Sequence, residues 1–242
     1  MSNRFTALII TGGSGKRFDN LKKQYVKLSG IPIFIRSAYY IFNHPSIFQR
    51  IVVVPEGDEN FVRDEMLEPF FNNNDVEITS GGETRQLSVY NGLVLAEEEY
   101  VIIHDGVRPL VDAETVDNCI SVAIECGGAV VSIPVSDTVK QVKDGKISKT
   151  ISRNEIYLAQ TPQAFRKDVL RLAYEMAFRD DFRATDDSMV LEYAINQGYI
   201  DEHEVEIRVV IGSQRNIKIT FPEDLLLAEF YINQIKNNII NT

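Results

Sequence analysis

Short β-branched runs alternate with longer amphipathic segments along most of this chain, and this alternation constrains the fold more than any other feature. Each apolar run has the length of one strand, and each amphipathic segment can cover a sheet as a helix. Strands joined through covering helices pair in parallel with right-handed crossovers. The apolar runs are 7–10, 51–54, 76–79, 101–103 and 129–133, and the amphipathic segments are 33–42, 59–70, 84–95 and 113–126. They predict an α/β fold with a Rossmann-like, mostly parallel, twisted sheet flanked by helices.

The alternation breaks in the segment 136–157, where two polar β-branched runs flank a turn. Residues 137–142 and 146–151 alternate Val, Ile and Thr with polar side chains, and Asp144-Gly145 lies between them. This arrangement is typical of a β-hairpin. Because an isolated two-stranded ribbon is marginally stable in water, we expect this arm to pack on a second copy of the chain. Helices at 167–178, 186–197 and 222–237 and a strand at 206–211 complete one predicted domain, 1–242.

Composition limits the classes of partner and the compartment. The net charge of -10 argues against a nucleic-acid partner, because binding a phosphate backbone requires a basic surface. No apolar run approaches the length of a membrane span, and we expect neither export nor membrane insertion, so the cytoplasm is the expected compartment. Cys119 and Cys126 lie in one predicted helix and are separated by ~10 Å along its axis, which is too far for a disulfide.

A glycine-rich turn follows the first predicted strand. Thr11-Gly12-Gly13-Ser14-Gly15-Lys16-Arg17 comes directly after the apolar run 5–10, and Lys22-Lys23-Gln24-Tyr25 follows. Glycines let backbone N–H groups approach phosphate oxygens closely, while lysine and arginine add charge-assisted hydrogen bonds. The segment predicts a cradle for a triphosphate, with an ordinary strand-to-helix turn carrying exposed cations as the alternative.

Two common glycine motifs do not fit this turn. A P-loop would need a glycine at the position of Ile10 and a hydroxyl side chain at that of Arg17. A dinucleotide-binding fingerprint that starts at Gly13 would need a small residue at the position of Phe18. A dehydrogenase is therefore disfavoured, and a nucleotide-binding module without turnover is a further alternative to an enzyme.

Four more polar segments fall near predicted strand ends, where ligands of open α/β sheets gather. They are Gly81-Gly82-Glu83-Thr84-Arg85-Gln86-Leu87-Ser88, His104-Asp105-Gly106-Val107-Arg108-Pro109, Ser152-Arg153 with Thr161-Pro162-Gln163, and Asn216-Ile217-Lys218-Ile219-Thr220. With the glycine turn, and in this order over nearly the whole chain, they resemble the cytidylyltransferases that couple CTP to a polyol phosphate. The resemblance is strongest to the 2-C-methyl-D-erythritol 4-phosphate cytidylyltransferase family of non-mevalonate isoprenoid biosynthesis.

The resemblance implies that the phosphate of the polyol attacks the α-phosphorus of CTP and that pyrophosphate leaves. A phosphate monoester is already an anionic nucleophile at neutral pH, so such an enzyme must mainly align it and neutralise developing charge. Fixed cations and Mg²⁺ would serve that purpose. By resemblance, Arg17 and Lys23 are the catalytic cations, and Asp105 is a Mg²⁺ ligand.

The resemblance also implies the binding residues. CTP would contact Thr11, Gly12, Gly13, Ser14, Gly15, Lys16, Gly82, Ser88 and Asp105, and the polyol phosphate would contact Asp105, Arg108, Arg153, Thr185, Asp186 and Lys218. Arg153 would reach the substrate of the neighbouring subunit in a homodimer formed through the arm.

Plainer structural roles stay open at several of these positions. Ser88 could bond its own helix backbone, and Asp105 could cap a helix or turn. Lys218 could face water, and Arg85 could form a surface pair with Glu83. His104 is expected to be a packed strand residue, because this reaction offers it no proton to move.

The sequence departs from the family pattern at two places and leaves one close alternative. Thr11-Gly12-Gly13 replaces the common Ala-Ala-Gly, and Lys22 replaces the proline that usually precedes the lysine. A ribitol-5-phosphate cytidylyltransferase is the alternative, which Gly12-Gly13 and Val107 favour slightly. The segments that favour the methylerythritol branch are Arg85-Gln86-x-Ser88, Thr185-Asp186-Asp187 and Pro222-Glu223-Asp224-Leu225.

Overall fold

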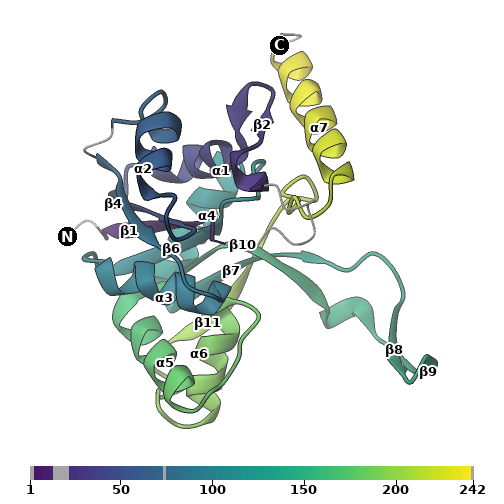
Figure 1. Cartoon of the computed structure of the whole chain (residues 1–242). Coiled ribbons are helices and arrows are strands. Elements are labelled where there is room, and N and C mark those ends of the chain that lie inside the picture. The colour runs from purple at the N-terminus through teal and green to yellow at the C-terminus, as the bar shows by residue number, and fades with distance from the viewer. Residues whose placement is uncertain (1–2, 13–21, 73–74, 241–242) are drawn as a thin grey trace.

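The computed structural model describes residues 3–12, 22–72 and 75–240, with side chains through 234. The main sheet consists of β1 (Phe5–Ile10), β4 (Ile47–Val54), β5 (Glu77–Ser80), β6 (Tyr100–Asp105), β7 (Gly127–Pro134), β10 (Tyr157–Arg166) and β11 (Glu206–Ile211). Within the described residues these strands lie in the order β11-β7-β10-β6-β1-β4-β5 (Figure 1). β1 pairs in parallel with β4 and β6, β4 with β5, and β7 with β11. The predicted mostly parallel sheet is confirmed.

Helices cover both faces of this sheet (Figure 1). They are α1 (Ile33–Phe42), α2 (Glu59–Phe61), α3 (Arg85–Leu95), α4 (Ala113–Cys126), α5 (Lys167–Arg179) and α6 (Asp187–Asn196), with a π-helical turn at Val62–Leu67. The last helix, α7 (Glu223–Ile240), stands apart from the sheet and packs with Leu28 and Ile33 in a separate small core. Ala7 and Ile9 of β1 pack in the same core as α1 and α4. Leu8 and Ile10 point to the other face and pack in the core formed by α3, α5 and α6. The two-residue period of a strand thus serves two cores at once.

Polar caps fix where three helices begin, and two of these starts lie at the candidate site. The Thr84 side chain accepts a hydrogen bond from the Leu87 amide at the start of α3. Asp186 accepts one from the Met189 amide at the start of α6, and Asp112 caps α4 in the same way. These side chains satisfy amides that have no partner within the helix, so the helix starts are defined by the local sequence.

The strand β10 is absent from the sequence-based prediction. It runs antiparallel between β6 and β7 in the middle of the sheet, and its register with β7 shifts between Ala159 and Gln163. Pro162 lies in this irregular stretch and cannot donate to a ladder, so the run does not look like a central strand in sequence. Its polar side chains nevertheless reach the carboxyl end of β6.

The predicted arm is confirmed as an antiparallel hairpin of β8 (Val139–Lys143) and β9 (Lys146–Ile151). It projects away from the sheet (Figure 1). Val142 and Ile147 on it are 56% and 65% exposed. A second, shorter ribbon joins β2 (Lys27–Leu28) to β3 (Ile31–Pro32).

Two further expectations can be compared with the structure. Cys119 and Cys126 are both free thiols, as their predicted spacing requires. Among the described residues, none of the helices combines the length and the apolar character that a membrane span demands.

The core facing α3, α5 and α6 generates a stability prediction. Phe165 of β10 is fully buried there, so Phe165→Ala should lower the free energy of unfolding by about 3–5 kcal/mol. Urea titration monitored by circular dichroism measures the change. Val94→Ala, at a position 44% exposed, is the control and should shift the free energy by less than about 1 kcal/mol. Equal losses in the two variants would contradict this description of the core.

Candidate active site

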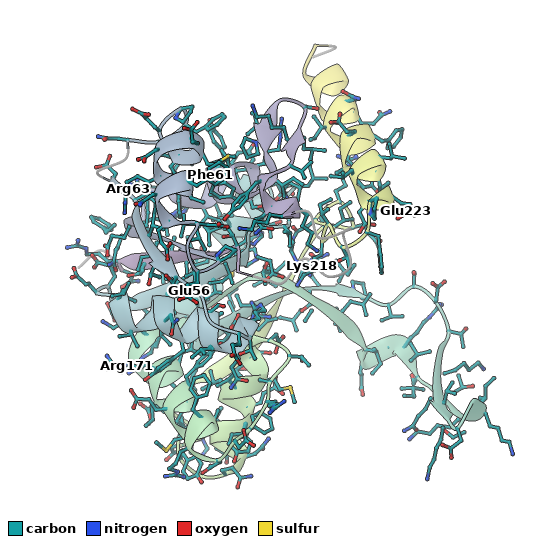
Figure 2. All side chains as sticks on the ribbon, in the orientation of Figure 1. Glu56, Phe61, Arg63, Arg171, Lys218 and Glu223 are labelled. Carbon is teal, nitrogen blue, oxygen red and sulfur yellow. The ribbon has the colours of Figure 1, made fainter. Side chains whose placement is uncertain are left out.

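Polar side chains from β6, β10, α3, α6 and the segment before α7 meet around a small cavity of about 90 Å³. Figure 2 shows Lys218 where the chain leading to α7 passes the root of the arm. Arg85, Asp105, Arg108, Ala159, Gln160, Thr161, Gln163, Thr185, Asp186 and Lys218 line the cavity. The structure therefore brings together the predicted polyol-phosphate residues Asp105, Arg108, Thr185, Asp186 and Lys218.

Asp105 lies at the centre of this cluster and faces three cations. Its Oδ1 accepts from Arg85 Nε at 3.0 Å, and its Oδ2 accepts from Lys218 Nζ at 2.7 Å. Arg108 Nε lies 3.7 Å from the same Oδ2. Burial by itself would raise the pKa of the Asp105 carboxyl, but the charges of Arg85, Lys218 and Arg108 outweigh it and hold that pKa well below its usual range. Asp105 is therefore a fixed anion.

Arg85 is the main side chain that the sequence analysis did not assign. Its guanidinium donates in a fork to both carboxylate oxygens of fully buried Asp187, at 3.0 and 2.8 Å, while Nε holds Asp105. The Tyr174 hydroxyl donates to Asp187 Oδ1 at 2.6 Å. The alternative of a surface pair with Glu83 is therefore wrong, because Arg85 points inward. Arg85 and Asp187 both lie in segments that resemble the family, Arg85-Gln86-x-Ser88 and Thr185-Asp186-Asp187, but no sequence pattern indicates that the two side chains pair.

Arg108 keeps a donor without a hydrogen-bond partner. It donates from Nη1 to the carbonyl of Asn216 at 2.8 Å. Its Nε is buried and makes no hydrogen bond with any residue in the described part of the chain. This Nε faces the Asp105 carboxylate from beyond hydrogen-bond distance, so the guanidinium is held by charge and can still donate to an anion that enters the cavity.

His104 has the structural role that the sequence predicts. Thr161 Oγ1 accepts from the Asp105 amide at 3.0 Å and lies 2.9 Å from His104 Nδ1. Nε2 lies 3.1 Å from the Arg108 carbonyl, which can only accept, so Nε2 carries the proton of the neutral ring and Nδ1 accepts from the Thr161 hydroxyl. Burial lowers the pKa of His104 to about 4, so the ring is neutral at pH 7. This chain of bonds fixes β6, β10 and the Arg108 turn relative to one another.

A second pocket of about 640 Å³ opens beside the first, at the ends of β1, β4 and β5 and the start of α3. Gly12, Gly81, Gly82 and Arg85 are among the residues that line it. A Cβ on Gly12 or Gly81 would lie 3.0 or 2.7 Å from Ser88 Oγ, so a side chain at either position would crowd the Ser88 hydroxyl. Arg85 borders both pockets, which places them next to each other.

Ser88 supports the floor of this pocket. Its Oγ accepts from the Gly82 amide at 3.0 Å and donates to the Thr84 carbonyl at 2.9 Å. The backbone-bonded alternative for Ser88 is therefore what the structure contains. Thr11 is similar, because it is buried and its hydroxyl donates to the Val53 carbonyl at 2.8 Å.

The remaining predicted residues are Lys23, Arg153 and five residues of the glycine-rich turn. Lys23 begins the 3₁₀ turn Lys23–Tyr25. Arg153, at the root of the arm, donates to the Ser136 carbonyl and does not line the described part of its own chain's cavity. The predicted triphosphate-binding residues Gly13, Ser14, Gly15 and Lys16 and the predicted catalytic Arg17 lie outside the described residues.

Asp105 fits poorly as a metal ligand. Both of its carboxylate oxygens already accept from cationic groups. The described residues contain no group of three or more His, Cys, Asp or Glu side chains placed to hold a metal ion. A protein site for Mg²⁺ would need carboxylate or carbonyl oxygens that are free to coordinate it.

His104 generates a prediction of how stability depends on pH. In the unfolded chain this imidazole is protonated below about pH 6.5, whereas in the folded protein it is protonated only below about pH 4. His104 therefore contributes stability above pH 6.5, and this contribution is lost as the pH falls toward 4. Between pH 6.5 and 5 it should remove on the order of 1–2 kcal/mol.

Urea unfolding of the wild type and of His104→Gln at the two pH values measures this loss. The variant should lose correspondingly less stability over that interval. An equal loss in both proteins would exclude His104 as its source.

Comparison with known proteins adds an independent finding. The family model of 2-C-methyl-D-erythritol 4-phosphate cytidylyltransferase matches residues 5–234. An enzyme of that name from Syntrophus aciditrophicus is 39% identical, over 99% of this chain and 100% of the relative. One from Geobacter metallireducens is 40% identical over 94% and 97%.

A solved structure shares the fold as well. The 4-diphosphocytidyl-2C-methyl-D-erythritol synthase of Anaerococcus prevotii superposes with a TM-score of 0.82 at 29% identity, covering 96% of this chain and 97% of the other. The order of motifs, the two adjoining pockets and the near full-length matches agree. The chain belongs to the 2-C-methyl-D-erythritol 4-phosphate cytidylyltransferase family.

Proposed function

We propose that this protein transfers the cytidylyl group of CTP to 2-C-methyl-D-erythritol 4-phosphate, giving 4-diphosphocytidyl-2-C-methyl-D-erythritol and pyrophosphate in isoprenoid biosynthesis. Its family membership is the observation that carries this proposal. The geometry supports it, because a glycine-lined pocket of nucleotide size adjoins a smaller cavity lined by cations and by hydrogen-bonding side chains.

In this mechanism the smaller cavity holds the polyol phosphate. Lys218 and Arg108 bind its phosphate, since the buried Arg108 Nε, 3.7 Å from Asp105 Oδ2, makes no hydrogen bond within the described residues. Asp105, ionised at every physiological pH, accepts from polyol hydroxyls and does not act as an acid or base. Thr185 and Asp186, at the start of α6, bind the other hydroxyls. The substrate is therefore aligned before reaction, which is the main contribution such a displacement needs.

The larger pocket holds CTP, with the cytosine near Gly82 and the α3 start. Lys23 and Arg17 neutralise the charge that develops on the α-phosphate and on the departing pyrophosphate. The resemblance carries both assignments, together with those of Gly13, Ser14, Gly15 and Lys16.

We propose that Mg²⁺ would enter with CTP as part of the substrate and would supply charge neutralisation at the phosphates. Mg²⁺ commonly keeps several waters and binds substrate phosphates, so it does not need a dedicated protein cage. Because three cations already surround Asp105 and would repel a further cation, we propose that this residue orients substrate hydroxyls and does not hold the ion.

Turnover with purified protein tests the reaction and the role of Lys23. Wild type with CTP and Mg²⁺ should release pyrophosphate with 2-C-methyl-D-erythritol 4-phosphate and more slowly with ribitol 5-phosphate. Lys23→Ala should reduce kcat by at least about 100-fold with little change in the unfolding midpoint. Lys27→Ala, on an exposed lysine of β2, is the control and should stay near wild type. Preference for ribitol phosphate would refute the substrate, and an active Lys23→Ala would refute the mechanism.

We further propose a homodimer in which the arm of each subunit reaches the site of the other. The projecting, exposed arm and the position of Arg153 outside its own chain's described cavity support this arrangement. We place the enzyme in the cytoplasm, where its two free thiols would stay reduced.

Mixed dimers test whether Arg153 acts across subunits. Arg153→Ala and Lys23→Ala should each be nearly inactive alone. After co-expression and isolation of the heterodimer by two affinity tags, about half of wild-type turnover per dimer should return, because one of the two sites then has both native side chains. An inactive heterodimer would place Arg153 and Lys23 in the same subunit's site.

A further inference from the structure

The segment that carries Lys23 is attached to the loop after β4 through one carboxylate, that of Asp58. Lys22 Nζ lies 2.5 and 2.7 Å from the two oxygens of Asp58. The Tyr25 hydroxyl donates to Asp58 Oδ2 at 2.9 Å. Both ends of the four-residue stretch 22–25 are therefore held by the same side chain, with Lys23 between them.

The surroundings make this contact more specific than a surface ion pair. The Asp58 side chain is only 12% exposed, although the Lys22 side chain is 53% exposed. The Tyr25 ring packs edge-on against Phe34 and Phe61, with centroids 5.9 and 5.5 Å away. Burial, followed by the bond and charge of Asp58, raises the pKa of Tyr25 far above its usual range, so its hydroxyl keeps the proton that it donates.

Asp58 serves the segment 22–25 and not the helix that it precedes. It is the N-cap residue of α2, but its own backbone is helical, with φ -93° and ψ -1°, and its side chain makes no capping bond. Its carboxylate binds Lys22 and Tyr25.

The backbone of Lys22 has a further property. Its φ is -74°, within the range of proline, and its carbonyl accepts from the Tyr25 amide at 2.9 Å. A proline at this position would keep that acceptor and would limit the backbone without any charge. The Lys22–Asp58 pair and a proline-fixed φ at position 22 are thus two physical ways to restrict the conformation of this turn.

We infer that Asp58 and Lys22 are positioning residues that fix the 3₁₀ turn bearing Lys23 for cytidylyl transfer. The inference rests on the proposed function for the role of Lys23. It assigns the Lys22 ammonium to Asp58 and not to the triphosphate, although the two lysines are adjacent in sequence.

Four variants test this inference: Lys22→Ala, Lys22→Pro, Asp58→Asn and the control Lys27→Ala. In Lys22→Ala and Asp58→Asn, kcat should fall about ten-fold, since small displacements of a catalytic group are costly, with KM for the polyol phosphate unchanged. Lys22→Pro should recover kcat to within about three-fold of wild type, because it restricts the same backbone angle. Lys27→Ala should match wild type.

Hydrogen exchange provides a readout that does not depend on activity. The amides of Tyr25 and Val26 bond to the carbonyls of Lys22 and Lys23, at 2.9 and 3.1 Å. Peptides covering 22–28 should exchange faster in Lys22→Ala and Asp58→Asn, and as slowly as wild type in Lys22→Pro.

Three results would overturn the inference. Low activity of Lys22→Pro with slow exchange would mean that the ammonium itself contacts CTP. Unchanged kcat in Lys22→Ala and Asp58→Asn would mean that the attachment does not position Lys23, and unchanged exchange would mean that it does not order the turn. A wild-type protein that fails to use CTP with the polyol phosphate would instead refute the proposed function, and the exchange data would still report whether Asp58 orders this turn.

Discussion

The arrangement of the candidate site depends on the ion pairs that the Asp105 carboxylate makes with three cations. A buried anion is tolerated only when it is paired and hydrogen-bonded, and Asp105 meets this condition with Arg85 and Lys218 from distant parts of the chain and with Arg108 three residues away. Arg85 comes from the start of α3, Arg108 from the turn after β6, and Lys218 from the segment before α7. Correct folding of the sheet and of its helices is therefore required before this single charge is compensated.

This dependence gives the site a fixed electrostatic character. Arg85 is shared between Asp105 and Asp187, so the carboxylates hold its guanidinium rigidly and it is a poor candidate for movement with substrate. Lys218 is more exposed and has one carboxylate partner in the described part of the chain, and Arg108 retains an unbonded donor. Arg85 and Lys218 thus both hold Asp105, and Lys218 and Arg108 are the cations that can meet a phosphate. The same principle recurs at Asp58, where one carboxylate orders a turn that carries a cation.

Much of this could be predicted from the printed sequence, for identifiable reasons. The parallel strands and α4 follow from apolar periodicity, and the arm follows from the Asp-Gly turn between alternating runs. The strand β10 could not be predicted, because Pro162 interrupts it and only neighbours on both sides can satisfy its backbone. The roles of Asp105, Arg108 and Lys218 came from a resemblance, and the structure places these residues together. The inward turn of Arg85 had no local signal, since a helix-start arginine is usually exposed.

The sequence by itself determined the alternating fold, the glycine positions and the set of charged residues from which a site could be built, because periodicity and backbone freedom are local properties. Only the tertiary structure decided which charges meet. In the folded protein Arg85 pairs with Asp187, and the Ser88 hydroxyl accepts from the Gly82 amide. The Asp58 carboxylate binds Lys22 and Tyr25. The physical reason is that burial decides the partner of a charge, and burial arises only when segments far apart in the chain pack together.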